Sequence, residues 1–512
     1  MSILRSLART KSIEQSIRDT DEPGHQLKKD LNGFDLIIFG IGVIIGTGIF
    51  VVTGRQAAEN AGPAIVLAFL IAGLVCGLAA MCYAEFASTV PVAGSAYTFG
   101  YAALGEFLAW IIGWDLILEF TLAASVVAVG WSGYASDLSG IPTSFDVGGW
   151  TVNAGAILIV IVLGVLSTLG TKLSGRVSMV IVAIKVGIVL LIIGVGAFYV
   201  KAANWTPFIP APHAVPAQET SIGHEPLTHV VFGLEPSQYG LWGVITAASV
   251  VFFAFIGFDV VATTAEETKK PKRDMPIGIF GSLIIVTLLY MAVSAVITGM
   301  RPYAELDTPA PLAEAFRAVG ADWAGSIISL GGVIGITTVI LVLMMGQARV
   351  GFAMSRDGLL PRGLSKSHPR FGTPYVMNIV TTVVVAVLAG LVPIGTLEEM
   401  VNIGTLFAFV IVSIGVIVLR RSRPDLPRAF RAPWVPVLPI IAALACAWLM
   451  VNLTVDTWIR FLVWMAVGVV IYLAYGMRNS RVGRAEREGA ATPEPVGSGP
   501  TASTGGAGGT GG

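Results

Sequence analysis

The sequence predicts an all-α polytopic membrane protein with twelve transmembrane helices. Of its 512 residues, 54% are hydrophobic and 12% are charged, half of the roughly 25% charge found in globular domains. So little charge cannot cover a soluble surface, which excludes a soluble enzyme and a disordered chain. The zero net charge also argues against a nucleic-acid-binding protein.

A membrane-spanning helix needs about 20 apolar residues, and twelve stretches of the sequence supply them. Two of these, 107–134 and 177–200, carry isolated ionisable residues. The ten charge-free windows are 36–54, 60–84, 147–171, 236–258, 275–300, 323–348, 371–397, 400–419, 432–455 and 461–477. The expected organisation is an N-terminal segment at 1–35, helices one to five at 36–200, an outer loop at 201–240, helices six to ten at 241–419, helices eleven and twelve at 420–477, and a disordered Gly/Thr-rich tail at 478–512.

The distribution of Lys and Arg predicts the orientation. Twelve helices place both termini on one side, and cytoplasmic segments are enriched in Lys and Arg. With the N-terminus inside, 26 of the 32 basic residues lie inside and five outside, and Lys185 lies within the membrane. We therefore expect a plasma-membrane protein with both termini in the cytoplasm.

Metal and disulfide chemistry are not expected. Cys76, Cys82 and Cys446 fall in apolar stretches without the spacing of a metal site or a disulfide framework. The Pro-rich outer loop contains three histidines whose spacing favours a solvated surface over a metal site. They are His213, His224 and His229. The sequence predicts neither a metal nor a cofactor.

The first helix is predicted to break near the middle of the membrane. It contains Gly40, Gly42, Gly46 and Gly48, and each glycine costs about 1 kcal/mol of helix stability relative to Ala. Gly42 and Gly46 also form a GxxxG helix-packing pair, but that alternative leaves Gly48 unexplained. A phosphate-binding loop is excluded because no lysine follows the glycines and no strand flanks them.

The sixth helix is interrupted in the same way, by Gly257 and Asp259 within FFAFIGFD. Matching interruptions in the first helix of two five-helix halves indicate a secondary transporter built from an inverted repeat, with its site at the midplane. Half-helix N-termini offer N–H groups to an anion, and half-helix C-termini offer carbonyl oxygens to a cation. A substrate that carries both charges, such as an amino acid, fits that pair of ends.

Here the sequence resembles the amino acid-polyamine-organocation superfamily, and within it the cationic amino acid transporter branch with its prokaryotic relatives. The resemblance covers nearly all of 30–477. It rests on the glycine-rich helix IGVIIGTGIF, on FFAFIGFD with the later AEETKKPKRDMP, and on QAR and SRDGLLP after helix eight. Together these motifs are specific, although each alone would be weak.

The resemblance implies a broken-helix fold of two inverted five-helix repeats plus two extra helices. It implies that the substrate carboxylate meets backbone N–H groups around Ile45, Gly46, Thr47 and Gly48. It also implies a second set of substrate-binding residues around the break in the sixth helix. In this set, backbone carbonyls bind the α-amino group and Phe258 is an aromatic gate. That set comprises Phe252, Phe255, Ile256, Gly257 and Phe258. The loop 135–152 lacks the cysteine through which related exchangers bind a glycoprotein chain, so we expect no disulfide-linked partner.

Lys185 is a functional candidate because an ionisable residue at membrane depth costs about 2.5–3.5 kcal/mol on insertion scales. It stands alone in 177–200, roughly 13 Å along the helix from its cytoplasmic start. Burial disfavours the charged form of a lysine, which would let Lys185 release and regain a proton. The alternative is a fixed counter-charge that holds helices together. The resemblance implies that this lysine occupies the place of a sodium ion in proton-coupled relatives, so we expect proton coupling.

Glu119 and Asp115 lie four residues apart and share one face of helix three. Burial and mutual proximity favour the protonated form of one of two such acids. The resemblance implies that Glu119 faces the substrate pocket and takes part in proton handling. A structural role, with Asp115 bonded to backbone, is an equal alternative.

Four further acids are predicted to act in structure or gating. Glu85 ends helix two, where it could bond the first half-helix, and Asp259 could order the break in helix six. Glu266 and Glu267 precede several Lys and Arg residues. That pattern is typical of an interfacial salt-bridge cluster, which would serve equally as a scaffold or as an inner gate.

The sequence therefore predicts a proton-coupled amino acid permease that imports its substrate across the lipid bilayer by alternating access. The alternative within transporters is an amino acid or polyamine exchanger. A channel is disfavoured because no span shows a continuous polar face. A membrane enzyme is disfavoured because no histidine lies inside a predicted span and no nucleophile and base converge.

Overall fold

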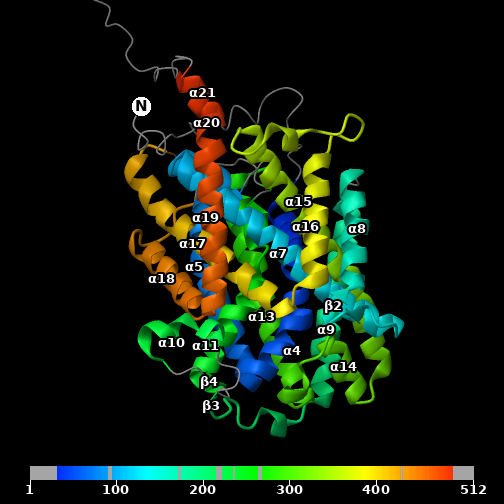
Figure 1. Cartoon of the computed structure of the whole chain (residues 1–512). Helices are drawn as coiled ribbons and strands as arrows, with labels where there is room; N and C mark the ends of the chain where they lie inside the picture. Colours follow the sequence, from blue (N-terminus) through cyan, green and yellow to red (C-terminus); the bar gives the residue numbers. More distant parts are fainter. Residues whose placement is uncertain are drawn as a thin grey trace, which may run out of the picture.

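Helices make up most of the protein and run side by side as a bundle (Figure 1). The computed structural model describes residues 31–89, 95–170, 175–214, 222–234, 237–262, 264, 268–426, 428 and 430–487. Within these residues, eight helices are long and apolar enough to cross a membrane, and four apolar helices are shorter. The prediction of a helical polytopic membrane protein is confirmed.

Each of the twelve predicted windows contains a helix, and short helices lie between them. The helices are α3 (Gly33–Ile44), α4 (Thr53–Gln56), α5 (Ile65–Thr89), α6 (Ser95–Ala103), α7 (Glu106–Ser139), α8 (Ala154–Thr168), α9 (Gly175–Gly196), α10 (Leu227–Phe232), α11 (Gly240–Val251), α12 (Phe258–Ala262), α13 (Pro271–Met300), α14 (Pro311–Ala318), α15 (Asp322–Arg356), α16 (Tyr375–Leu391), α17 (Ile394–Ser422), α18 (Val437–Val451), α19 (Val455–Ile471), α20 (Met477–Asn479) and α21 (Arg481–Arg487). The strands are β1 (Ser144–Val147), β2 (Trp150–Asn153), β3 (His213–Ala214) and β4 (Ser237–Gln238).

The predicted helical window 147–171 is wrong at its N-terminal end. Strands β1 and β2 form an antiparallel hairpin, and α8 begins only at Ala154. Gly148 and Gly149 both have positive φ, at 58° and 85°, which suits a two-residue hairpin turn. The window was chosen because it lacks charged residues, and a strand can lack them as well as a helix. The predicted helix therefore included residues of the hairpin that precede Ala154.

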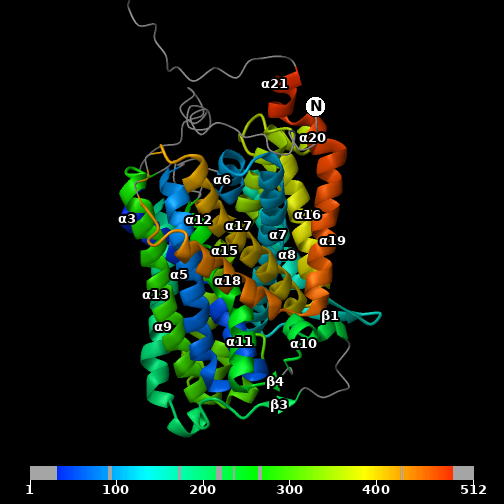
Figure 2. The same ribbon diagram turned by 90° about the vertical axis from the view of Figure 1, so that its left-hand side faces the viewer.

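Helix α7 occupies the interior of the bundle. It packs against α8, α15, α16 and α17, and its most apolar segment is more completely buried than that of any other described long helix. Figure 2 shows α7 enclosed by its neighbours, with α19 along one flank. A residue on α7 is therefore well placed to face an internal site.

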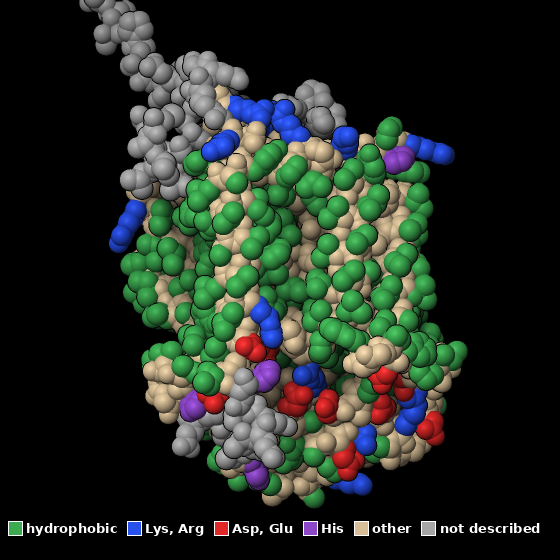
Figure 3. Space-filling view, in the orientation of Figure 1, with side chains coloured by type: hydrophobic (Ala, Val, Ile, Leu, Met, Phe, Trp, Pro, Cys, Tyr) green, Lys and Arg blue, Asp and Glu red, His purple; other side chains and the backbone are tan. Residues whose placement is uncertain are grey.

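The outside of the bundle is an apolar band bounded by two polar ends (Figure 3). On the face shown, the end that carries α21 displays Lys, Arg and His without acids, whereas the opposite end mixes acids, bases and His. The three cysteines are free and buried.

Candidate functional site

The first membrane helix is broken where the glycines predicted. Helix α3 begins at a capping box, in which Asn32 Oδ1 accepts from the N–H of Asp35 and Asp35 Oδ2 accepts from the N–H of Asn32. It ends at Ile44, and Ile45 is extended, with φ −70° and ψ 101°. A π-helical turn then starts at Gly48. The break therefore presents carbonyls from one half-helix and N–H groups from the other.

The carbonyls at the end of α3 bind Lys185. Its side chain on α9 is wholly buried, and Nζ donates to Gly42 O at 2.6 Å and to Ile45 O at 3.1 Å. In the described part of the chain, no carboxylate forms an ion pair with this ammonium group. Its positive charge thus sits at the negative end of a half-helix, where the helix dipole stabilises a cation.

Tyr290 joins the two broken helices, and sequence reasoning missed it. This buried side chain on α13 places its hydroxyl 2.7 Å from Ile44 O and 3.1 Å from Ala254 O. A buried tyrosine hydroxyl usually has a hydrogen-bond partner. An isolated tyrosine in the apolar window 275–300 therefore indicated a buried hydrogen bond at Tyr290. Nothing in the sequence identified broken-helix carbonyls as that partner.

The second break lies directly against the first. A 3₁₀ turn, Phe252–Phe255, ends α11, and α12 starts at Phe258. Gly257 has φ 123°, and a Cβ there would lie 2.8 Å from Val43 Cγ1. A Cβ on Gly48 would lie 2.4 Å from Ala254 Cα. A side chain is excluded at Gly48 because the two backbones touch there, and at Gly257 because of the positive φ and the close approach of Val43.

Asp259 orders the second break. Its Oδ1 accepts from the backbone N–H of Gly257 at 3.1 Å, and the side chain is buried. The other carboxylate oxygen, Oδ2, has no hydrogen-bond partner among the described residues. Asp259 thus holds the unwound backbone through one oxygen, at the position where the sequence placed it.

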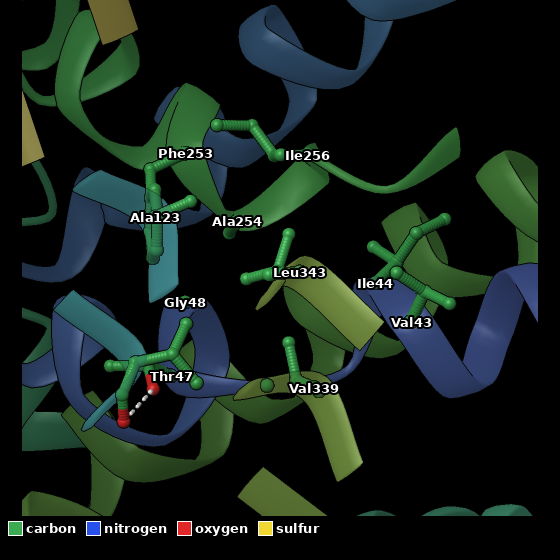
Figure 4. A pocket seen from close by; sticks show the side chains of 12 residues that line it. Val43, Ile44, Thr47, Gly48, Ala123, Phe253, Ala254, Ile256, Val339 and Leu343 are labelled. Carbon is green, nitrogen blue, oxygen red and sulfur yellow. Dashed lines mark hydrogen bonds between the residues drawn. The ribbon is translucent and has the colours of Figure 1, made fainter. Parts of the chain in front are cut away.

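A cavity opens between the two breaks (Figure 4). Its free volume, about 20 Å³, admits about one water molecule, so a larger ligand must displace lining side chains. Its lining residues are Val43, Ile44, Gly46, Thr47, Gly48, Ala123, Val127, Phe253, Ala254, Ile256, Val339 and Leu343.

Four residues predicted to bind substrate line this cavity: Gly46, Thr47, Gly48 and Ile256. The other predicted residues surround the lining without belonging to it. They are Ile45, Phe252, Phe255, Gly257, Phe258 and Glu119. Sequence reasoning missed the apolar lining residues of α7 and α15, because an apolar residue in a long apolar helix gives no sign of whether it faces a ligand, a neighbouring helix or lipid.

The side chains that line the cavity are almost entirely apolar, and backbone groups supply its polar surface. Thr47 contributes the one polar side chain in the lining that the structure describes, and its hydroxyl donates to Val127 O at 3.4 Å. Ala123 and Val127 lie one turn apart on α7, opposite Val339 and Leu343 of α15. Such a pocket suits an apolar group held beside polar backbone ends.

Comparison with known proteins gives the family. A family model described as amino acid permease matches residues 31–472. The chain belongs to the amino acid permease family. This permease is therefore an amino acid transporter of the amino acid-polyamine-organocation superfamily and a multi-pass membrane protein, and the predicted resemblance is confirmed.

Several characterised relatives align over most of the permease. It is 47% identical to the branched-chain amino acid permease BcaP of Bacillus subtilis, and 44% identical to the methylthioribose transporter of the same organism. Each alignment covers 93% of the permease and 99% of the relative. The vacuolar cationic amino acid transporter 4 of Arabidopsis thaliana is 35% identical, over 82% of the permease and 68% of the relative.

Phe258 packs into an aromatic cluster beside the cavity of the permease. Its ring lies 5.1 Å from that of Phe409 and 5.8 Å from that of Tyr83, measured between centroids. Phe252 contacts Phe409 as well, at 5.6 Å. The cluster joins α5, α12 and α17, so a movement of Phe258 would require repacking of all three.

Helix α7, which contributes to the cavity wall, also carries two buried acids. Asp115 and Glu119 are fully buried, and neither carboxylate oxygen of Asp115 has a hydrogen-bond partner among the described residues. The alternative in which Asp115 bonds to backbone finds no such bond among the described residues. Asp259 lies near enough to Glu119 to interact with it electrostatically. Glu119 precedes the cavity-lining Ala123 by one helical turn, about 6 Å along the axis.

The prediction that Glu85 bonds the first half-helix is wrong. Its carboxylate instead accepts from Arg420 Nε at 2.8 Å, from Arg420 Nη2 at 2.6 Å and from the N–H of Ala432 at 2.8 Å. Arg428 lies 3.4 Å away. Two guanidinium groups stabilise a buried carboxylate more than the partial charge at a helix end does. Through Arg420, Glu85 connects α5 to α17. Glu266 and Glu267 lie outside the described residues.

The outer-loop histidines are dispersed rather than gathered around a metal site. His213 Nδ1 lies 2.8 Å from Ala211 O, and His229 Nδ1 lies 2.7 Å from Glu225 Oε2. His224 lies 3.8 Å from Asp456. No group of three potential metal ligands occurs among the residues that the structure describes.

Proposed function

We propose that this permease imports a neutral branched-chain amino acid together with a proton. The substrate carboxylate binds N–H groups of Gly46, Thr47 and Gly48, and the α-amino group binds carbonyls around Phe252, Phe255 and Ile256. The contact between the two breaks supports this arrangement, because it brings the N-terminal end of one half-helix beside the unwound backbone of the other.

The apolar side chains that line the cavity carry the proposal, because the substrate side chain would lie against them. No acid is among the described lining residues, so the cationic side chain of lysine or arginine would lose its hydration without a counter-charge. Thr47 alone cannot satisfy the several hydroxyls of methylthioribose, the solute named for one relative. The wall suits the aliphatic side chains of the amino acids that the BcaP relatives are named for.

Proton coupling is assigned to Lys185. Protonated, it links α9 to the carbonyls of Gly42 and Ile45. When it loses its proton, the carbonyls lose a charged donor and α3 is freer to move away from α9. Glu119 is the second candidate proton carrier, because its carboxylate is buried one helical turn from the cavity-lining Ala123.

The proposed topology is twelve spans in two inverted five-helix repeats plus two helices, in the cell membrane. The match between the breaks at Gly46 and Gly257 supports the repeat. The basic end beside α21 in Figure 3 supports cytoplasmic termini. Alternating access would then move the scaffold of α7, α8, α15 and α16 relative to the broken helices.

Uptake into proteoliposomes with an inward proton gradient tests the proposed function. Labelled leucine, isoleucine and valine should accumulate, and lysine and methylthioribose should not compete. Competition by lysine comparable to that by leucine would contradict the assignment of the pocket. Uptake that requires internal amino acid and ignores the gradient would instead show an exchanger.

A further inference from the structure

The β1–β2 hairpin is amphipathic. Phe145 pairs with Val152 and Val147 pairs with Trp150, so these four side chains share one face. Asp146 and Thr151 pair on the other face, where the threonine hydroxyl donates to Asp146 Oδ1 at 2.7 Å. The apolar face is uncovered: Phe145 is 52% exposed, Val147 63% and Trp150 69%.

The base of the hairpin is fixed to the bundle. The hydroxyl of Ser132, buried on α7, donates to Asn153 Oδ1 at 2.6 Å, and the Thr143 hydroxyl donates to Ser132 O at 3.2 Å. Asn153 Oδ1 also accepts from the N–H of Ala156 at 3.0 Å, which caps α8. The orientation of the apolar face is therefore set by α7 and α8.

The hairpin leads directly into α8, whose exposed side chains are apolar. Both ribbon views show the hairpin reaching sideways beyond the helices, at the end of the bundle where α8 begins (Figures 1 and 2). The apolar surface of α8 starts one turn after the hairpin and is exposed along the helix. Its exposed side chains include Leu158, Ile161, Val162 and Val165.

We propose that this face rests in the acyl–headgroup boundary of the leaflet beside it. Direct attachment to α8 indicates lipid as the occupant, because in a multi-pass protein the exposed apolar side chains of α8 contact acyl chains. Aromatic residues such as Trp150 are enriched at that depth. Residues 140–153 contain no Lys or Arg and one acid, which points to zwitterionic rather than anionic phospholipid. The hairpin thereby fixes the depth of α7, which carries the cavity wall.

Spin labels on neighbouring residues test this placement. Val147→Cys and Asp146→Cys variants of the full chain are labelled and reconstituted in phosphatidylcholine vesicles, with the unsubstituted protein, whose cysteines are buried, as background. The label at 147 should collide more often with oxygen than with a water-soluble nickel chelate, and the label at 146 should show the reverse. Equal nickel access at both positions would overturn the proposal, as would a label at 147 shielded from both reagents, which indicates a covering protein or second copy.

A second measurement does not need the cysteine variants. The tryptophan fluorescence of the unsubstituted permease minus that of Trp150→Phe reports residue 150 alone. In vesicles of phosphatidylcholine with brominated acyl chains, this difference should be quenched relative to unbrominated vesicles. An unquenched difference would overturn the proposal. This result would hold even if transport is normal, because the fluorescence reports the position of residue 150 and not transport activity.

Discussion

The ammonium nitrogen of Lys185 lies 2.6 Å from the carbonyl oxygen of Gly42. This contact joins α9 to the last turn of α3. Gly42 directly precedes Val43 and Ile44, which line the cavity. The charge on Lys185 and the geometry of the break are therefore coupled through the backbone. A change in protonation at Lys185 can alter the site without a side chain reaching the substrate.

Gly48→Ala should abolish transport. The added Cβ would lie 2.4 Å from Ala254 Cα, so the two broken helices must separate and the site must change shape. Gly77→Ala is the matched control, because nothing lies within 4 Å of its added Cβ and Ala is favoured over Gly in a helix. The check is leucine uptake together with thermal unfolding. Normal uptake by Gly48→Ala would show that the helices do not meet at this point.

Tyr290→Phe should reduce transport while the bundle still folds. The variant leaves the carbonyls of Ile44 and Ala254 without their hydroxyl donor, at a cost of about 1–3 kcal/mol for an unsatisfied buried group. The loss should appear as a lower melting temperature and a lower maximal uptake rate. If the melting temperature and the uptake rate both match those of the unsubstituted protein, Tyr290 does not hold the breaks together.

Arg55→Gln should destabilise the end of the bundle where α4 meets α17. Arg55 binds Glu59 at 2.9 Å and Glu398 at 3.3 Å, and the Glu398 side chain is 1% exposed. The substitution leaves a buried carboxylate without its partner, which we expect to cost about 2–3 kcal/mol because Arg55 is only partly buried.

A second substitution separates the ion pair from other effects. Arg55→Gln combined with Glu398→Gln should recover much of the lost melting temperature, since neither charge then remains. Arg301→Gln, which removes a pair with the exposed carboxylate of Glu305, should change stability by less than about 0.5 kcal/mol. A double variant no more stable than Arg55→Gln would argue against a buried ion pair.

Ala123→Val should shift selectivity toward smaller amino acids. Ala123 is fully buried in the cavity wall, and added methyl groups leave less room for a branched side chain. A methylene misfit is worth about 1–3 kcal/mol, so the ratio of alanine to isoleucine uptake should rise roughly tenfold or more. The ratio is measured within one variant, which removes differences in expression. An unchanged ratio would place the substrate side chain elsewhere.

Much of the fold could be predicted from the sequence, because a bilayer imposes long apolar windows and glycines reveal breaks within them. Gly48 and Gly257 were found for that reason, and Lys185 was found because a lysine in an apolar window is conspicuous. The hairpin was not predicted, since Gly148 and Gly149 sit in a window whose lack of charge fits strand and helix equally. Tyr290 and the wall residue Val339 were missed because their importance depends on which helix packs against which.

Glu85 shows a different limit of sequence reasoning. Its burial was foreseeable from its place at the end of an apolar helix. Its partner Arg420 lies 335 residues away, and no local pattern relates the two. An ionisable residue at membrane depth thus marks a site of interest, and the tertiary structure decides whether it serves transport or packing.

Proton-driven accumulation of leucine by Lys185→Met, compared with the unsubstituted permease, tests the proposed mechanism most directly. Met keeps the length of the side chain without the nitrogen that carries the proton, and Lys201→Met is the control at an exposed lysine. Lys185→Met should still exchange leucine across the membrane without a gradient, and it should show no added accumulation when an inward proton gradient is imposed. Accumulation that still rises with the gradient in Lys185→Met would contradict the assignment of proton coupling to Lys185.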